Sequence, residues 1–141
     1  MKKKSDKIAF VSMCADGLHH GHINIIEKAR NYGNVWIGLM TDKGIMSYKK
    51  RKPLINFKNR KKVLSHIGAI HKIIAINDLN FSKIAKKYKI DYWIHGDDWK
   101  TGTQSLARLN LIKTMKIWKG KVIDVSYTKN ISSSRLFRFL D

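Results

Sequence analysis

The sequence predicts an α/β fold, a single Rossmann-like domain built on a doubly wound, five-stranded parallel sheet. Short runs rich in β-branched residues alternate with longer segments of helical periodicity, which is typical of parallel α/β proteins. The 141 residues are enough for one compact domain. The chain has one proline and neither repeats nor a linker that would divide it, so we expect residues 1–141 to fold as one unit.

Five short apolar runs are the predicted strands. The first of them, Ile8–Met13, directly follows a lysine-rich start. In order, the predicted strands are Ile8–Met13, Val35–Met40, Lys72–Ile76, Tyr92–His95 and Val122–Ser126.

Five longer segments between and after these strands are the predicted helices. In the first, His22, Ile26 and Ala29 recur at i, i+4 and i+7, with Gly33 as the expected C-cap. Ser132 is the expected N-cap of the last. The predicted helices are Gly21–Tyr32, Phe57–Ile67, Asn80–Tyr88, Ser105–Trp118 and Ser132–Leu140.

Ligands of a doubly wound sheet bind beyond the carboxyl ends of its strands, near the point where strand order reverses. We therefore expect the functional residues in the loops that follow the strands. These loops are Cys14–His20, Thr41–Ile55, Asn77–Leu79, Gly96–Gln104 and Tyr127–Ile131.

The net charge, the single cysteine and the apolar runs of the sequence indicate which partners and which cellular compartment to expect. A net charge of +19 suits a polyanionic partner, but the basic residues are spread along the chain and also fit a solvated surface. The single cysteine, Cys14, excludes an internal disulfide and favours a reducing, cytoplasmic setting. There is no apolar run of the ~18 residues that a membrane span requires.

The first of these loops contains His19-His20-Gly21-His22, called here the HHGH segment. It follows a strand and opens a helix, and the free N–H groups of a helix N-terminus attract anions. His19 and His22 are three residues apart and can donate together to phosphate oxygens as charge develops on a leaving pyrophosphate. Gly21 lets a ligand approach the backbone. Structural or helix-capping histidines are the alternative, and a metal site with Cys14 is a third possibility.

Basic residues follow the second predicted strand. Lys49 lies in a long basic loop that can close over a phosphate-bearing ligand and supply a point charge. Arg60, near the start of the next helix, either reaches the same ligand or pairs with an acid elsewhere.

Two further loops contain polar side chains suited to a nucleotide. Adjacent Asp97 and Asp98 follow a buried strand, where one can hold a sugar hydroxyl or a backbone N–H and one can orient Mg²⁺ near phosphates; a plain turn is the alternative. Ser132, Ser133 and Ser134 open the last helix with three hydroxyls, which suits a phosphate cradle or, for Ser132, a simple N-cap.

Taken in order, these motifs resemble the cytidylyltransferase branch of the HxGH nucleotidyltransferase superfamily over nearly the whole chain. Its opening GxFDxxHxGH pattern is matched at Asp16 and in the HHGH segment, while Cys14 and Ala15 replace the usual Thr and Phe. The other matching positions are Thr41-Asp42, Lys49, Arg60, the intact Gly-Asp-Asp-Trp of Gly96 to Trp99, and the helix start Ile131-Ser132-Ser133-Ser134. HxGH alone is shared with adenylyltransferases, so the preference for CTP rests on the last two motifs.

The resemblance implies a set of roles. The catalytic residues would be His19, His22 and Lys49, which stabilise the α-phosphoryl and pyrophosphate oxygens of CTP. The nucleotide would be bound by Cys14, Ala15, Asp97, Ile131, Ser132 and Ser133. The acceptor substrate would be bound by Asp16, Asp42, Arg60, Gln104 and Arg108. Mg²⁺ would bridge the phosphates with Asp16 as its protein contact, and the resemblance also implies a homodimer.

One departure concerns the acceptor. Glycerol-3-phosphate cytidylyltransferases carry an arginine where this chain has Tyr127. The stretch from Lys100 to Gln104 with Arg108, together with Ser47-Tyr48-Lys49, is more similar to cytidylyltransferase domains associated with phosphonate biosynthesis. We therefore expect a small phosphonate such as 2-hydroxyethylphosphonate as acceptor, with glycerol 3-phosphate as the alternative. A non-catalytic, basic nucleic-acid-binding domain is the hypothesis from another class, and nucleic acid is not the expected partner.

Overall fold

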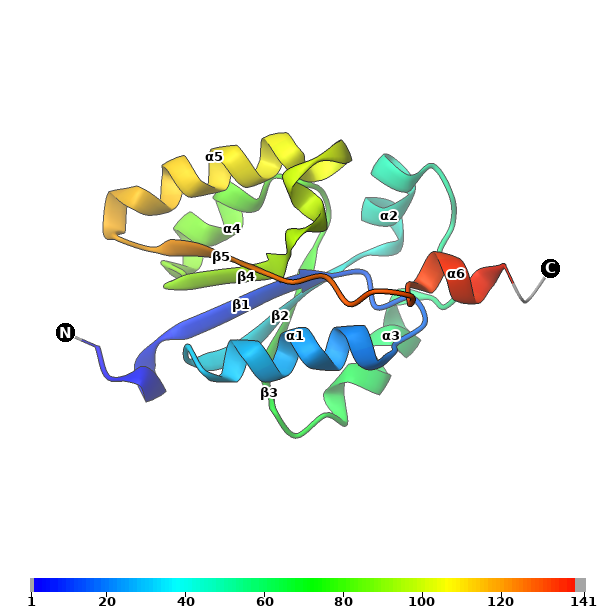
Figure 1. The fold of residues 1–141 in the computed structure, drawn as a ribbon, viewed down its shortest axis with the longest axis horizontal. Coiled ribbons are helices and arrows are strands. Elements are labelled where there is room, and N and C mark those ends of the chain that lie inside the picture. The colour runs from blue at the N-terminus through cyan, green and yellow to red at the C-terminus, as the bar shows by residue number, and fades with distance from the viewer. Residues whose placement is uncertain (1, 139–141) are drawn as a thin grey trace.

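A computed structural model describes residues 2–138 and has a five-stranded, wholly parallel sheet at its centre (Figure 1). The order across the sheet is β3-β2-β1-β4-β5. The strands are β1 (Ile8–Met13), β2 (Asn34–Met40), β3 (Ile70–Ile76), β4 (Tyr92–Gly96) and β5 (Lys121–Val125). The predicted fold class is confirmed, and each strand lies within two residues of its predicted start.

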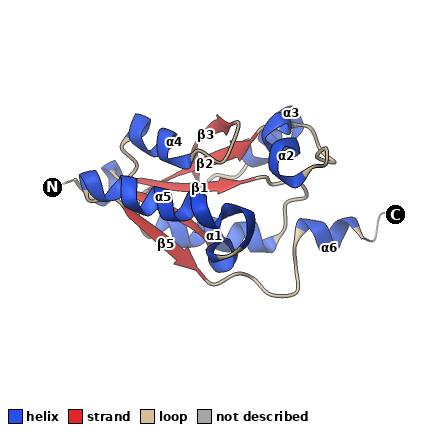
Figure 2. Cartoon of the chain, turned by 90° about the horizontal axis from the view of Figure 1, so that it is seen from above, coloured by secondary structure: helices blue, strands red, loops and turns tan. Residues whose placement is uncertain are grey.

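Helices cover both faces of the sheet (Figures 1 and 2). The face covered by α1 (His20–Arg30) and α3 (Phe57–Ser65) has Val11, Ile37 and Ile94 at its core. On the other face Phe10 and Trp93 pack 4.4 Å apart beneath three helices. These are α2 (Asp42–Lys49), α4 (Phe81–Tyr88) and α5 (Ser105–Met115). A sixth helix, α6 (Ser133–Phe137), lies beyond the carboxyl ends of the strands.

The central strand shows why the local sequence takes this form. Ala9, Phe10 and Val11 of β1 are all buried because helices cover both faces, so the strand is continuously apolar rather than alternating. Helix starts are fixed by polar side chains: the oxygens of Thr41 and Asn56 accept from main-chain N–H groups of α2 and α3.

Two features of the predicted outline are wrong. The segment Thr41–Ile55 is not all loop, because Thr41 caps the two-turn helix α2. Gly33 is not the C-cap of α1, which ends at Arg30. A Cβ atom at Gly33 would lie 2.5 Å from the carbonyl oxygen of Lys7, so the glycine is required for close approach of two backbones.

The predicted last helix, Ser132–Leu140, is observed as α6, with Ser132 as its N-cap; Leu140 lies outside the described residues. Among residues 2–138, no helix is both long enough and apolar enough to cross a membrane.

The sheet reverses its strand order at β1. The chain runs outward from β1 through β2 to β3, and then returns to place β4 on the other side of β1. The connections that leave the carboxyl ends of β1 and β4 therefore diverge to opposite faces, which opens a crevice between them.

Candidate active site

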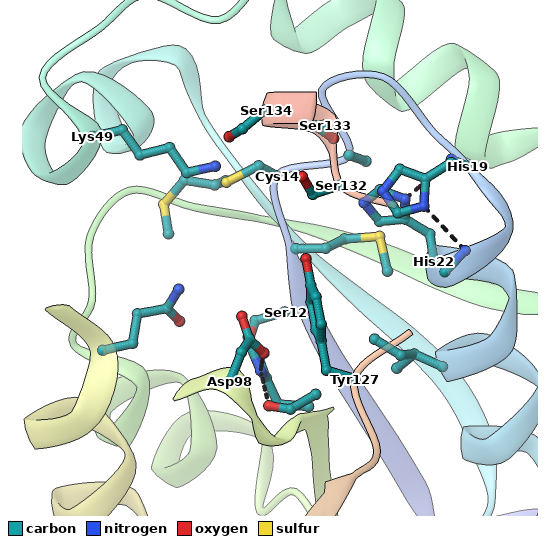
Figure 3. A pocket seen from close by; sticks show the side chains of 18 of the residues that line it. Ser12, Cys14, His19, His22, Lys49, Asp98, Tyr127, Ser132, Ser133 and Ser134 are labelled. Atoms are coloured by element: carbon teal, nitrogen blue, oxygen red, sulfur yellow. Dashed lines mark hydrogen bonds and ion pairs between the residues drawn. The ribbon is translucent and has the colours of Figure 1, made fainter. Parts of the chain in front are cut away.

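A pocket of about 590 Å³ occupies this crevice at the switch point (Figure 3). Its walls come from the segment after β1, from the start of α1, from α2, from the end of β4 and from the chain leading into α6. Of the residues predicted to act on a ligand, nine line it: Cys14, Ala15, His19, His22, Lys49, Gln104, Ile131, Ser132 and Ser133. Segments distant in sequence thus meet where the fold class predicts a ligand.

The two histidines of the HHGH segment cap the helix that carries them. The main-chain N–H of Gly21 donates to Nδ1 of His19 at 3.0 Å. In return, the main-chain N–H of His19 donates to Nδ1 of His22 at 3.1 Å. The two rings lie 4.1 Å apart between centroids, both against the pocket.

This capping arrangement fixes the tautomer of both rings. A ring nitrogen that accepts a hydrogen bond from a main-chain N–H carries no proton, so in the neutral imidazole the proton is on Nε2. Burial lowers the pKa of His22 to about 4, with a further contribution from His19. Burial, followed by the charge of His20, also lowers the pKa of His19. Both rings are therefore neutral near pH 7, and each leaves an Nε2–H donor for a ligand.

Gly21 is required by the histidines themselves. A Cβ atom at this position would lie 2.8 Å from the His19 ring, so any side chain would displace the ring from its capping position. Gly21 was predicted to let a ligand approach the backbone, and in the structure it leaves room for the imidazole ring of His19.

Two cationic side chains line the pocket, Lys49 and Arg51; Arg51 lies 3.4 Å from the Asp16 carboxylate, and Lys49 comes from the last turn of α2. Its side chain extends into the pocket in Figure 3. Its charge contributes to lowering the pKa of His22 and opposes the rise in the pKa of Asp98. Lys50, which follows it, adopts a left-handed conformation with φ 57° and ends the helix, so Lys49 is placed by a defined helix end rather than by an irregular loop.

The two aspartates after β4 have different surroundings. Asp97 accepts a hydrogen bond from the main-chain N–H of Tyr127 at 3.1 Å and is outside the pocket lining. Asp98 lines the pocket, where burial raises its pKa (Figure 3). Asp97 was the residue predicted to bind the nucleotide, but the short 3₁₀ helix at Asp97–Lys100 turns Asp98 to the pocket instead.

His95 also lines the pocket, although it was not among the predicted site residues. Its ring stacks on Trp99 with centroids 4.2 Å apart, and its Nδ1 donates to the carbonyl of Gly96 at 2.8 Å. Burial is the main cause of its lowered pKa. His95 lies at the carboxyl end of β4, next to the point where the strand order reverses. This position in the sequence could have identified it as a pocket residue.

The segment before α6 closes the pocket. Ser132 accepts from the main-chain N–H of Arg135 at 3.1 Å as an N-cap, and Ser133 donates to the carbonyl of Gly17 at 3.1 Å. The Tyr127 side chain lines the pocket beside Asp98 (Figure 3).

Asp16 does not fit the predicted magnesium contact. It is 1% exposed and outside the pocket lining. Its two carboxylate oxygens accept from the main-chain N–H groups of Leu54 and Ile55, both at 2.9 Å, and Arg51 lies 3.4 Å away. Within residues 2–138, no three His, Cys, Asp or Glu side chains are grouped to hold a metal ion. Asp16 instead attaches the segment after α2 to the segment after β1.

Arg60 and Asp42 form a buried connection beneath the pocket. The Arg60 guanidinium is fully buried and donates to Asp42 and to the carbonyls of Cys14 and Met40, each at 2.7 Å, and to that of Ile55 at 2.8 Å. Both residues were predicted to bind the acceptor. Arg60 is inaccessible to a ligand and pairs with Asp42, so the alternative of an acidic partner is the one observed. Its other donors satisfy carbonyls at the ends of β1 and β2.

Arg108 is likewise paired rather than free. It donates to both carboxylate oxygens of Asp124, at 3.0 and 2.7 Å, and Trp99 donates to the same carboxylate at 2.6 Å. The pKa of Asp124 is lowered mainly by the Arg108 hydrogen bond. Of the predicted acceptor-binding residues, only Gln104 lines the pocket.

The fold and the pocket together define a nucleotidyltransferase-type domain, with its HHGH segment at the end of the first strand of a parallel sheet. The cytidylyltransferase-like family model matches residues 14–139, and the chain belongs to this family.

Similar proteins fall in the same group. Glycerol-3-phosphate cytidylyltransferase of Bacillus spizizenii is 34% identical over 88 residues, which are 60% of this chain and 67% of that protein. Ethanolamine-phosphate cytidylyltransferase of Arabidopsis thaliana is 28% identical over 104 residues, 70% of this chain and 24% of that one. The bifunctional protein HldE of Methylobacillus flagellatus is 27% identical over 99% of this chain, which spans only 28% of that relative.

Solved structures support the fold. The lipopolysaccharide core biosynthesis protein from Thermoplasma volcanium superposes with a TM-score of 0.73 at 17% identity, covering 87% of this chain and 98% of that one.

Proposed function

We propose that this protein transfers CMP from CTP to a small acceptor that carries a phosphate or phosphonate group, with release of pyrophosphate. The observation that supports this best is the pair of neutral Nε2–H donors of His19 and His22 at the N-terminus of α1, with Lys49 across the same pocket. Membership of the cytidylyltransferase-like family supports CTP as the donor.

The proposed reaction is a single in-line displacement. An oxygen of the acceptor's phosphate or phosphonate forms a bond to the α-phosphorus of CTP, while the bond to the bridging oxygen of pyrophosphate breaks. The attacking oxygen is already anionic, so no general base is needed. His19 and His22 donate to the oxygens on which charge develops, and Lys49 adds a positive charge in the same place. Positioning and charge stabilisation account for catalysis without a covalent intermediate.

For the acceptor, we propose a small phosphonate of the 2-hydroxyethylphosphonate kind. Tyr127 lines the pocket where an arginine is expected in glycerol-3-phosphate enzymes, so this wall is less cationic. Glycerol 3-phosphate is the second candidate, favoured by the 34% identity to a glycerol-3-phosphate cytidylyltransferase.

The test is a panel of acceptors with CTP and Mg²⁺, followed by release of pyrophosphate and by the mass of the CMP adduct. The panel contains 2-hydroxyethylphosphonate, glycerol 3-phosphate and ethanolamine phosphate, and ATP replaces CTP in a parallel series. Turnover with CTP and one acceptor supports the proposal and names the substrate. Turnover with ATP alone would identify an adenylyltransferase, and a silent panel with tight, salt-sensitive RNA or DNA binding would favour a nucleic-acid-binding domain.

The remaining expectations stay predictions. They are a homodimer, a cytoplasmic setting and a requirement for Mg²⁺. The Asp16 carboxylate is committed to main-chain donors, and no step above depends on a metal ion.

A further inference from the structure

Cys14 and Tyr48 make a direct polar contact at the edge of the pocket. The Cys14 Sγ and the Tyr48 hydroxyl are 2.8 Å apart, and either atom can donate. Cys14 belongs to the segment after β1, and Tyr48 to the last turn of α2, 34 residues later. The contact therefore joins α2 to the segment that leads into the HHGH segment, and both residues line the pocket.

Other contacts join the same parts of the chain. The Asp16 carboxylate accepts from the main-chain N–H groups of Leu54 and Ile55 just after α2. At the other end of α2, the Arg60 guanidinium joins Asp42 to the carbonyl of Cys14. Ala15 lies between Cys14 and Asp16 in a left-handed conformation, φ 51°. The basic stretch of residues 49–52 is thus flanked by contacts to the segment after β1, at Tyr48 before it and at Leu54 and Ile55 after it.

Lys49 directly follows Tyr48, so the orientation of α2 decides where its ammonium group lies. Tyr48 is three and four residues from the buried Ile45 and Gly44 and shares their face of the helix. Lys49 is about 100° further round the helix and projects into the pocket (Figure 3). The Cys14–Tyr48 contact is therefore at the C-terminal end of this short helix, one residue before Lys49.

The Tyr48 hydroxyl is suited to a permanent contact. Burial, together with Cys14, raises the pKa of Tyr48 well above its usual range, so the phenol keeps its proton at any working pH. Tyr48 also packs against the core cluster that contains Phe10 and Ile45.

We propose that Tyr48 is a positioning residue whose contact with Cys14 holds α2 in place and keeps the Lys49 ammonium group at the reacting phosphates. The inference rests on the proposed function for the role of Lys49. Tyr48 and Cys14 would affect turnover indirectly, through the position of Lys49, and not by contact with the reacting atoms.

The experiment compares the full-length wild type with Tyr48→Phe, Cys14→Ala, Cys14→Ser and the Cys14→Ala/Tyr48→Phe double variant. We expect kcat to fall about fivefold in Tyr48→Phe and in Cys14→Ala, the factor that corresponds to one ordinary hydrogen bond, with KM for CTP changed less than about twofold. The double variant falls no further than either single variant. In Cys14→Ser, whose hydroxyl can pair with Tyr48, kcat should fall less than in Cys14→Ala.

Lys49 provides the decisive comparison. If Tyr48 acts through Lys49, then Tyr48→Phe has no further effect on kcat in a Lys49→Ala background. Tyr88→Phe is the matched control. Tyr88, at the end of α4, packs against Trp36 of β2 and does not line the pocket, so kcat should equal that of wild type. Additive losses in Tyr48→Phe/Lys49→Ala, or an unchanged kcat in Tyr48→Phe, would overturn the inference.

Amide hydrogen exchange of residues 42–50 gives a readout that does not depend on CTP. We expect faster exchange in Tyr48→Phe and Cys14→Ala, and wild-type rates in Cys14→Ser and Tyr88→Phe. If the wild type transfers no cytidylyl group, the proposed function fails, and the contact is judged by exchange alone. Unchanged exchange in Tyr48→Phe then rejects the positioning role.

Discussion

The Nδ1 atom of His22 accepts a hydrogen bond from the main-chain N–H of His19 at 3.1 Å. With the complementary bond from Gly21 to His19, this contact satisfies two main-chain donors at the start of α1. It also places the remaining proton of each ring on Nε2. The capping role and the proposed catalytic role of the histidines are therefore compatible, because each uses a different ring nitrogen.

Replacing His22 separates these roles. His22→Asn keeps an oxygen that can accept from His19 but loses the Nε2–H donor, whereas His22→Ala loses both. We expect kcat to fall by about 100-fold or more in both variants. Thermal unfolding should show a lower midpoint in His22→Ala only. A near-normal kcat in His22→Ala would contradict the catalytic assignment.

Acid should destabilise the protein through the same ring. The pKa of His22 is about 4 in the folded state and near 6.5 when unfolded, so the unfolded chain binds the proton more tightly between these values. The free energy of unfolding should therefore fall as pH drops from about 6.5 to 4, by up to about 3 kcal/mol from this group. Urea unfolding across this range measures the loss. His22→Asn should show a shallower dependence, and an equal slope in both proteins would contradict the prediction.

Asp98, rather than Asp97, should affect nucleotide binding. Asp98→Asn removes a carboxylate that faces the pocket, and we expect KM for CTP to rise about tenfold, as for loss of a hydrogen bond to a charged group. Asp97→Asn is the matched control, because its amide oxygen can still accept from Tyr127. Steady-state kinetics gives KM for CTP in both variants. A larger rise in Asp97→Asn than in Asp98→Asn would support Asp97 as the nucleotide-binding residue, as predicted from sequence.

Asp16→Asn should reduce stability without changing the response to magnesium. One of the two main-chain donors that the carboxylate holds, at Leu54 or Ile55, would lose its acceptor, at a cost of about 1–3 kcal/mol. Urea unfolding measures this, with the exposed Asp6→Asn as control. The Mg²⁺ concentration for half-maximal activity should not move; a large increase would show that Asp16 contacts the metal.

Arg60→Lys should be as damaging as a core substitution. A lysine cannot reproduce the donors that the guanidinium directs to three carbonyls and Asp42, so buried oxygens would be left without partners. We expect a loss of about 3 kcal/mol in the free energy of unfolding. Lys61→Ala, at an exposed position on the same helix, should change stability by less than about 0.5 kcal/mol. Equal stability of the two variants would contradict the structural role.

The sequence by itself determined the parallel α/β class, the strand positions and the place of the HHGH segment, because these follow from local periodicity and the chemistry of short segments. Only the tertiary structure decided which polar side chains face the ligand. Asp16, Arg60 and Arg108 match ligand-binding positions in sequence, yet each is committed to a partner distant along the chain. Asp98, His95 and Tyr48 reach the pocket because of a 3₁₀ turn, a strand end and an unpredicted helix. Periodicity reveals which residues are buried, but the partner of a polar group depends on how separate segments pack, and that is fixed only in three dimensions.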